Sequence, residues 1–469
     1  MRASMGAMSA AWILLFGAHV ACGYSVLSHE ALVDALWDVA IKPTLMERFP
    51  SATPEQLKEA HGYAYGGAII QDMGFYPQGN GYFSDLTHYA RPGDFIRALL
   101  RDAQTLDDLA FALGALSHFA GDCYGHRYGT NIAEPRVYPK LKKKYGTSIT
   151  YAQNPNKHLK TEFGFDVLEV ARGNYASQAY HDFIGFYVAR PLLERAFRET
   201  YGFELADMFG DLPRAIESYR RTVSNLVPLA TRVAWAQHKD DIEKLRPGIT
   251  RRRFVYVMRR PCNDAQNGRG VSRAAQRVSD SMSCIAARIR ALYANSEREW
   301  GRNYERPSVW DRILAFLLRV LPPIGPLNTL HFKVLTPPAQ QDFMRSFELA
   351  TELYRNQLRA ASRQDVNLPN DNFDVGAITP PATYTLQDLA YAYWLDQLAE
   401  QKFAGVTPEV RDAVISYYAN IDLPFSSKKQ KKTWRRLLVE VDQLKRSAPA
   451  SAVATNDRVR QTNQAASGR

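Results

Sequence analysis

The stretch LSHFAGDCYGHRYGTN, Leu116–Asn131, decides both the fold class and the chemistry that this sequence predicts. It places His118, Asp122 and His126 at intervals of four residues. Because each step of four residues turns only about 40° around an α-helix, the three side chains would share one broad helix face. Taken alone, such a triplet is also typical of a polar helix surface, or of a buried histidine paired with the aspartate beside it.

Residues before the triplet indicate where this helix starts. Thr105, followed by Asp108 three residues later, forms a capping box, which predicts that the helix begins there. Leucines then recur on one side of the predicted helix, at Leu106, Leu109, Leu113 and Leu116.

Apolar residues recur every three to four positions through most of the chain, as in amphipathic helices. The first such helix, around Ala31, is predicted to stop at Pro43. Comparable periodicity predicts helices in residues 167–200, 213–238, 270–300, 340–362 and 385–402. Alternating strand patterns and internal repeats are lacking, so the sequence predicts an all-α fold.

Further histidines and carboxylates accompany the triplet. KHLKTEFGFD repeats the spacing with His158 and Glu162, while IIQDMGFYP and SDLTHYARP supply Asp72 and His88. His29 lies near the start of the first helix. Imidazole with carboxylate, and without cysteine, suits Zn²⁺ in a hydrolytic site that keeps open positions. The joint pattern predicts a zinc site, although each piece alone is a weak signal.

The amino-terminal residues have the pattern of a signal peptide. Arg2 precedes a short apolar run, and Ala21-Cys22-Gly23 supplies small residues for cleavage. We therefore expect export to the periplasm or beyond the cell, with residues 1–23 removed and Tyr24 first. Lipoprotein processing at Cys22 is the alternative, but His19 stands where such signals normally carry leucine.

Composition is that of an ordinary globular protein, with 46% hydrophobic and 23% charged residues. Four cysteines exclude a scaffold built on disulfides, although Cys262 and Cys284 could pair in an oxidising compartment. The formal net charge is +11, and the densest basic run is Lys428–Arg436. Such a run indicates either a solvated helix start or attraction to anionic lipid or nucleic acid.

The order of these residues along the chain resembles the zinc-dependent phospholipase C superfamily, which also contains fungal single-strand nucleases and glycosylphosphatidylinositol phospholipase D. The likeness rests on motifs between Tyr24 and Asp166. It implies an all-helical bundle with three zinc ions, in a catalytic domain over residues 24–250. We expect a helical carboxy-terminal extension over 251–446 and a disordered tail over 447–469, which is small and polar in composition.

The resemblance also implies which residues bind each ion. The first ion would be held by Asp72, His88, His118 and Asp122; the second by His126, His158 and Glu162; and the third by His29, Asp122 and the backbone amine and carbonyl of Tyr24. A free α-amino group is a good nitrogen ligand once a cation displaces its proton. Family members usually begin with Trp, but the change to Tyr24 leaves the backbone ligand atoms in place. Asp72 would be either a ligand only or also the catalytic proton acceptor.

The implied activity is hydrolysis of a phosphodiester, and the expected enzyme is a phospholipase C acting on phospholipid head groups. Phe75, Tyr76 and Tyr89 could bind a head group or stack on a base, or could instead be core packing. The apolar segment 313–321 is either a buried helix or an interfacial element. An anionic membrane surface is a further candidate partner, and no specific protein partner is predicted.

Two alternatives remain open. A single-strand nuclease of the same fold is favoured by the short spacing from Tyr24 to His29, but disfavoured by Glu162, because nucleases tend to have Asp there. The second alternative is a helical protein that binds metal but does not catalyse a reaction. Its basic carboxy-terminal half would bind an envelope partner. The complete ligand set argues against it.

Overall fold

The computed structural model describes residues 24–171, 186–223, 332–333, 335–363, 365–419 and 428–447. The amino-terminal half contains α2 (Val26–Leu36), η1 (Trp37–Ile41), α3 (Lys42–Arg48), α4 (Pro54–Ile69), η2 (Ile70–Phe75), α5 (Gly81–Tyr89), α6 (Pro92–Asp102), α7 (Leu106–Gly125), η3 (His126–Thr130), α8 (Asn131–Val137), α9 (Pro139–Tyr145) and α10 (Pro155–Ala171). Later elements are α12 (Arg190–Tyr201), α13 (Leu205–Met208), α14 (Leu212–Arg221), α20 (Pro337–Ser362), α21 (Thr385–Glu400), α22 (Pro408–Tyr417) and α23 (Lys428–Arg446).

The described residues form helices joined by turns and loops, and they contain no strand apart from one isolated bridge between Asn372 and Ala377. The predicted all-α fold is therefore confirmed. None of the helices in the described ranges is both long enough and apolar enough to cross a membrane. Several predictions concern segments that lie outside the described residues. These segments are the leader, the apolar segment 313–321, the Cys262–Cys284 pair, the domain boundary near residue 250 and the tail beyond residue 447.

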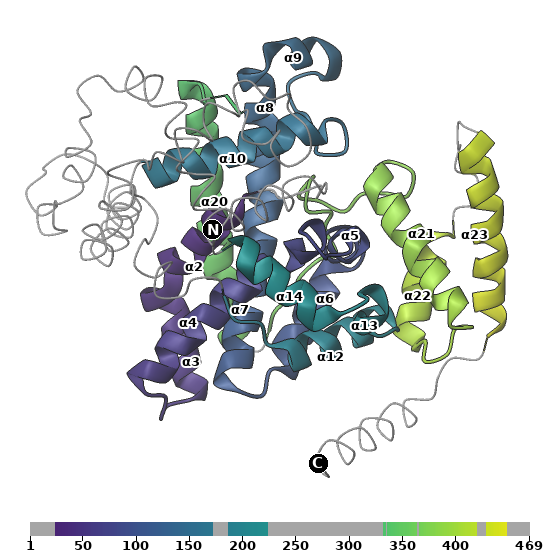
Figure 1. Cartoon of the computed structure of the whole chain (residues 1–469), viewed down its shortest axis with the longest axis horizontal. Helices are drawn as coiled ribbons and strands as arrows, with labels where there is room; N and C mark the ends of the chain where they lie inside the picture. Colours follow the sequence, from purple (N-terminus) through teal and green to yellow (C-terminus); the bar gives the residue numbers. More distant parts are fainter. Residues whose placement is uncertain are drawn as a thin grey trace, which may run out of the picture.

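Helix α7 forms the centre of the fold (Figure 1). It begins at the predicted capping box, in which Thr105 and Asp108 bond to each other's backbone N–H groups. It packs closely against α4, because a Cβ added at Gly67 would lie 1.9 Å from the carbonyl oxygen of Phe111, and one at Gly114 would lie 2.0 Å from that of Ala64. This close crossing places the end of α4, and therefore η2, beside the polar residues of α7.

Helix α20 packs along another side of α7, although it comes more than two hundred residues later in the chain. The hydroxyl of Tyr354 on α20 donates to the carbonyl oxygen of Leu113, at 2.9 Å. Phe343 of α20 also stacks on Phe165 of α10, with ring centroids 4.2 Å apart. The α20 segment predicted over residues 340–362 is thus a structural neighbour of the amino-terminal helices.

Pro43 does not act as the sequence predicted, and a second proline, Pro191, also lies in the first turn of a helix. Pro43 does not end the first helix: the chain passes through the π-helical turn η1, and Pro43 lies in the first turn of α3. Conversely, the helix predicted over 167–200 is interrupted, because residues 186–189 are not helical and α12 begins with Pro191 in its first turn. Proline lacks an N–H group, and the first turn of a helix is where that group is not needed.

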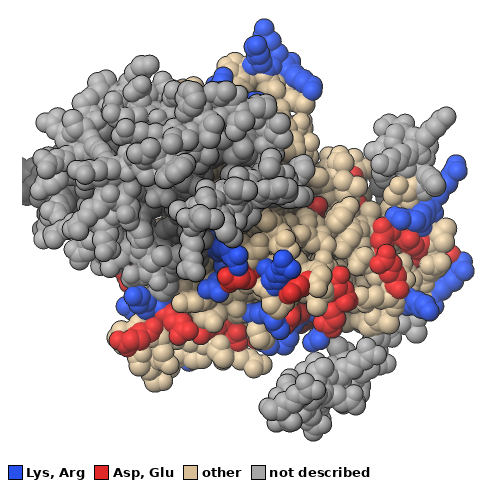
Figure 2. Space-filling view, in the orientation of Figure 1, with Lys and Arg blue, Asp and Glu red and all other residues tan. Residues whose placement is uncertain are grey.

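Helices α21, α22 and α23 pack together, and α21 also packs on α5 (Figure 1). The indole N–H of Trp394 on α21 donates to the carbonyl oxygen of Tyr201, at 2.7 Å. The basic run that starts at Lys428 begins α23, whose Leu437, Val441 and Leu444 are buried. On the face shown in Figure 2, acidic and basic side chains are interspersed, and a purely basic tip lies over α9.

Candidate metal centre

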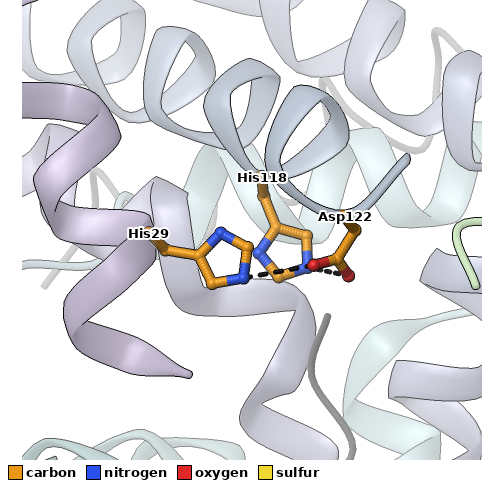
Figure 3. Close-up of side chains that lie close together, drawn as sticks. All are labelled: His29, His118 and Asp122. Carbon is orange, nitrogen blue, oxygen red and sulfur yellow. Dashed lines mark ion pairs between the residues drawn. The ribbon is translucent and has the colours of Figure 1, made fainter. Parts of the chain in front are cut away.

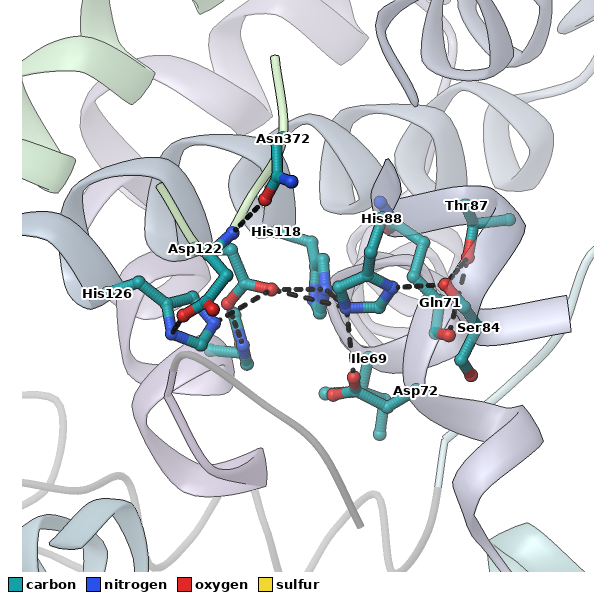
Figure 4. A network of polar contacts seen from close by, with 12 residues as sticks. Ile69, Gln71, Asp72, Ser84, Thr87, His88, His118, Asp122, His126 and Asn372 are labelled. Atoms are coloured by element: carbon teal, nitrogen blue, oxygen red, sulfur yellow. Dashed lines mark hydrogen bonds and ion pairs between the residues drawn. The ribbon is translucent and has the colours of Figure 1, made fainter. Parts of the chain in front are cut away.

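The first group of predicted ligands meets at the crossing of α7, η2 and α5. Asp72, His88 and His118 offer ligand atoms that lie within 4.8 Å of one another, and all three are buried. The Nε2 atom of His88 is 3.4 Å from Asp72 Oδ1 and 3.2 Å from His118 Nε2. Asp122 completes the group, with its Oδ2 3.3 Å from His88 Nε2 and 3.2 Å from His118 Nε2 (Figure 4).

The backbone fixes the orientation of two of these rings. The Nδ1 atom of His88 lies 2.7 Å from the carbonyl oxygen of Ser84, and Nδ1 of His118 lies 2.8 Å from that of Ala68. A carbonyl oxygen only accepts, so each Nδ1 carries the proton in these bonds. The lone pair of the neutral ring is then on Nε2, the atom that points into the group.

The second group lies on the other side of Asp122. His29 on α2, His118 and Asp122 form it, and Figure 3 shows the three side chains pointing toward one another. His29 Nε2 is 3.2 Å from Asp122 Oδ1, and the rings of His29 and His118 stack with centroids 4.2 Å apart. The two oxygens of Asp122 therefore face different groups, as expected for a carboxylate shared between two cations.

The third group forms where α7 gives way to the π-helical turn η3. His126 begins this turn, so the predicted continuous helix through all three members of the triplet ends just before its last member. His126 Nδ1 lies 3.0 Å from His158 Nε2 on α10 and 3.0 Å from Asp374 Oδ1. The structure thus brings together His126 and His158 as predicted, and adds a carboxylate that sequence reasoning missed.

Two glutamates adjoin this third group. Glu162, the predicted ligand, has Oε1 2.8 Å from His158 Nε2, but within the described residues the compact trio is formed by His126, His158 and Asp374. Glu134, also missed, has Oε2 3.4 Å from Nδ1 of His158. No local spacing in the sequence marks Glu134 or Asp374, because their histidine partners come from other elements.

Burial and mutual charge shift the pKa values in this region strongly. Burial alone would lower the pKa of His88, but Asp122 and Asp72 outweigh it and raise that pKa to about 10. Burial, together with His126, lowers the pKa of His158 to about 3. Burial and the nearby Asp122 and Asp374 raise the pKa of Glu162 well above its usual range. The carboxylates of Asp72 and Asp122 therefore favour positive charge beside His88, which is what a metal cation provides.

Tyr24 lies at the edge of the second group. Its side chain is fully buried, and its ring meets the ring of His29 edge-on with centroids 5.9 Å apart. It also packs against Phe343 of α20, at 5.4 Å. Whether its backbone amine binds metal depends on removal of the leader, so that assignment stays a prediction.

The three aromatic residues predicted to bind substrate are all buried. Phe75 and Tyr89 each lie with ring centroids 5.9 Å from that of His88, and Tyr76 packs against Tyr219 at 4.4 Å. Their exposed fractions are 7% for Phe75, 8% for Tyr76 and 4% for Tyr89. Such contacts agree with the core-packing alternative, and a role in binding substrate stays a prediction.

The residues present fit zinc. All three groups combine imidazole nitrogens with carboxylate oxygens, and the buried Cys123 belongs to none of those found among the described residues. The carboxylate oxygens of Asp72 and Glu162 are buried, and no backbone N–H or hydroxyl group in the described part of the chain donates to them; only imidazole nitrogens approach. Buried carboxylates without such donors are costly unless a cation or a proton compensates them.

Comparison with known proteins agrees with this chemistry. The family model described as zinc dependent phospholipase C matches residues 28–209, which contain every predicted side-chain ligand. Neither a curated protein nor a solved structure matches the chain significantly. Taken with the helical fold and the three groups of histidine and carboxylate, the match shows that residues 28–209 belong to the zinc-dependent phospholipase C family.

Proposed function

We propose that this chain is an exported phospholipase C that hydrolyses the phosphodiester of phospholipid head groups. Membership of the family supports a zinc-dependent hydrolase of phosphodiesters. The choice of phospholipid, rather than single-stranded nucleic acid, rests on the family description and on Glu162. Export rests on the leader sequence alone.

One observation carries the hydrolytic assignment: the carboxylate of Asp122 faces one histidine group with each oxygen. Oδ1 lies 3.2 Å from His29 Nε2, and Oδ2 lies 3.3 Å from Nε2 of His88, which belongs only to the first group. A shared carboxylate holds two cations close to each other. Zinc ions in such a site, when bound, activate water and stabilise the charge of a phosphodiester and its leaving oxygen.

The ligand assignment follows the resemblance and the geometry together. We assign the first ion, at the first group, to Asp72, His88, His118 and Asp122. The second ion, at the third group, is assigned to His126, His158 and Glu162. The third ion, at the second group, is assigned to His29, Asp122 and the amine and carbonyl of Tyr24. This gives three ions per chain.

The chain's own groups then have distinct tasks. Asp122 would bind two cations, one with each oxygen, and the backbone carbonyls that hold His88 and His118 keep their Nε2 atoms directed inward. Asp72 receives the proton released during hydrolysis, because its buried carboxylate is bonded by no backbone or hydroxyl donor among the described residues. No serine or cysteine nucleophile is required.

A comparison of substrates tests the proposal. One zinc-loaded sample of mature protein is given phosphatidylcholine, phosphatidylinositol and single-stranded DNA in parallel, with and without a chelator. We expect a phospholipid to be cleaved fastest, releasing diacylglycerol, and expect chelation to abolish the reaction. Faster cleavage of DNA would establish the nuclease alternative. Full activity without metal would overturn the zinc mechanism, and no turnover of any phosphodiester would leave the non-catalytic alternative.

A further inference from the structure

Asp374 lies beyond residue 209, where the family match ends, in the segment between α20 and α21. It is 1% exposed, yet it carries a carboxylate into the metal centre. Its Oδ1 is 3.0 Å from His126 Nδ1, and that nitrogen is in turn 3.0 Å from His158 Nε2. Three potential metal-binding atoms therefore converge, and one comes from outside the family domain.

The two oxygens of this carboxylate have different surroundings. Oδ2 accepts a hydrogen bond from the backbone N–H of Tyr151, at 2.8 Å, and another from the hydroxyl of Tyr384. Oδ1 has no hydrogen bond of acceptable geometry within the described part of the chain, and faces the two imidazoles. One oxygen is thus held in place while the other is directed at the histidine pair.

The backbone around Asp374 is fixed as well. Its N–H donates to Asn372 Oδ1 at 3.1 Å, and its carbonyl oxygen accepts from Asn131 Nδ2 at 2.7 Å. The N–H of Phe373 donates to the carbonyl oxygen of His88, at 3.2 Å. Gly376 has φ +64°, and a Cβ there would lie 2.2 Å from the carbonyl oxygen of Cys123. The segment is therefore pressed against α7 beside the ligands.

The geometry around Asp374 suits a metal ion. Its Oδ1 accepts no hydrogen bond from a backbone N–H or hydroxyl group in the described part of the chain, and lies 3.0 Å from His126 Nδ1. Its neighbours His126 and His158 supply the nitrogen donors that zinc prefers.

We propose that Asp374 is a ligand of the second metal ion, alongside His126, His158 and Glu162. This inference rests on the zinc binding proposed above and extends it to a residue outside the family domain. Asp374 would add a carboxylate oxygen to the nitrogen donors of His126 and His158, a mixed donor set of the kind that zinc accepts. The segment before α21 would then contribute a ligand to the metal centre.

The test uses the full mature chain and two neighbouring carboxylates. Asp374→Asn keeps the shape of the side chain but removes its charge, whereas Asp371→Asn changes a half-buried aspartate three residues earlier that belongs to none of the histidine groups. Zinc content after dialysis against a weak chelator, and the zinc affinity of each site, are measured for both variants and for the unmodified protein. Thermal unfolding is recorded with and without zinc.

We expect Asp374→Asn to retain two zinc ions instead of three. The zinc affinity of the second site should fall by more than ~10–100-fold, which is the loss expected when a residue that only hydrogen-bonds to a metal ligand is removed. Without zinc, its unfolding temperature should match that of the unmodified protein, and the rise on adding zinc should be smaller. Asp371→Asn should retain three ions. If Asp374→Asn binds three ions with unchanged affinity while the unmodified protein is zinc-loaded and active, the inference fails and the proposed function stands. If the unmodified protein binds no zinc, both fail.

Crystals of the unmodified protein give an independent measurement should Asp374→Asn not fold. Anomalous scattering at the zinc edge locates the second ion directly. We expect it at about 2.0–2.2 Å from an oxygen of Asp374. An ion bound by His126 and His158, with both Asp374 oxygens beyond ~3 Å, would show that Asp374 only positions His126, and would overturn the inference.

Discussion

The hydroxyl of Tyr24 lies 2.7 Å from Oγ of Ser346, which is 322 residues further along the chain. This bond ties the start of the described chain, two residues before α2, to α20. The ring of Tyr24 also covers Gly125, where an added Cβ would come within 2.8 Å of it. Tyr24 is therefore positioned by α7 and α20 together, close to His29.

The amine of Tyr24 is a ligand only if no residue precedes it. An additional residue there turns the amine into an amide, which coordinates zinc poorly, so the third ion should be weakly bound while the other two persist. Metal analysis of proteins with and without one leading methionine measures this. Mass spectrometry of the exported protein should also find Tyr24 first, with a free amine. A lipidated Cys22, or a full set of three ions in the extended protein, would rule out the terminal ligand.

The side chain of Tyr24 has a separate role. Tyr24→Phe removes the buried hydrogen bond to Ser346 and should lower the free energy of unfolding by about 1 kcal/mol. Because the proposed ligand atoms at this residue belong to the backbone, zinc content and activity should be retained. Chemical denaturation and metal analysis of the same sample measure both effects. Loss of zinc in Tyr24→Phe would mean that the ring, not the terminus, organises the third site.

Asp122 and its neighbour Cys123 form a matched pair for mutation. Asp122→Asn removes the charge that faces both histidine groups, so activity should be lost and occupancy should fall at two sites. Cys123→Ser changes an adjacent buried side chain that belongs to none of the groups in the described residues, and should keep both metal and activity. Equal damage from the two substitutions would indicate that α7 is a packed core helix and not a ligand helix.

Gly121 offers a test of the second group in which no ligand residue is substituted. A Cβ at this position would lie 2.9 Å from Leu32 Cδ1 and 3.0 Å from His29 Nδ1. Gly121→Ala should therefore displace His29, weaken the third ion and lower stability by about 1–3 kcal/mol through overpacking. Gly81→Ala is the control, since no atom approaches its added Cβ within 4 Å. Unchanged zinc affinity in Gly121→Ala would place the ion elsewhere.

Removal of zinc should lower stability as well as activity. Each ion at 100 times its dissociation constant contributes about 2.7 kcal/mol, provided that it binds only the folded chain. Chelation should therefore lower the unfolding temperature by several degrees, and zinc should restore it while Mg²⁺ should not, because imidazole donors suit zinc. Calorimetry of the metal-free and reloaded protein measures this. An unfolding temperature that does not change on chelation would argue against a buried metal centre.

The basic tip on α9 is the structural candidate for contact with an anionic membrane. Its Lys140, Lys142, Lys143 and Lys144 are exposed. Replacing all four with Gln should weaken binding to anionic vesicles by about 1 kcal/mol per lysine, and the effect should shrink in high salt. Hydrolysis of a short-chain monomeric substrate should not change. If vesicle binding survives, the same replacement in the run Lys428–Arg436 identifies whether α23 carries it.

The residues that sequence reasoning placed correctly are those with local signals. The capping box fixed the start of α7, and spacing of four residues brought His118 to Asp122, and His158 to Glu162, on single helices. The all-α fold followed from apolar periodicity in the same way. These signals act over one or two helical turns, so one sequence is enough to detect them.

Asp374 could not be found in that way. It is held by Tyr151, Tyr384 and Asn131, which lie on separate segments, and its histidine partners lie far from it in the chain. The effect of Pro43 was misjudged for a related reason. Proline excludes the helix interior but accepts the first turn, and only the surrounding packing decides which occurs.

The proposed donors of the metal centre extend from His29 to Asp374, and this span would set the order of events in the cell if the chain is exported as proposed. Most of the polypeptide must be synthesised before the last carboxylate can arrive, and distant contacts of this kind form late in folding. A chain that is threaded unfolded through an export channel cannot carry the assembled centre. Zinc would then be acquired on the far side, so the producing cell's own phospholipids would not meet a working enzyme during synthesis.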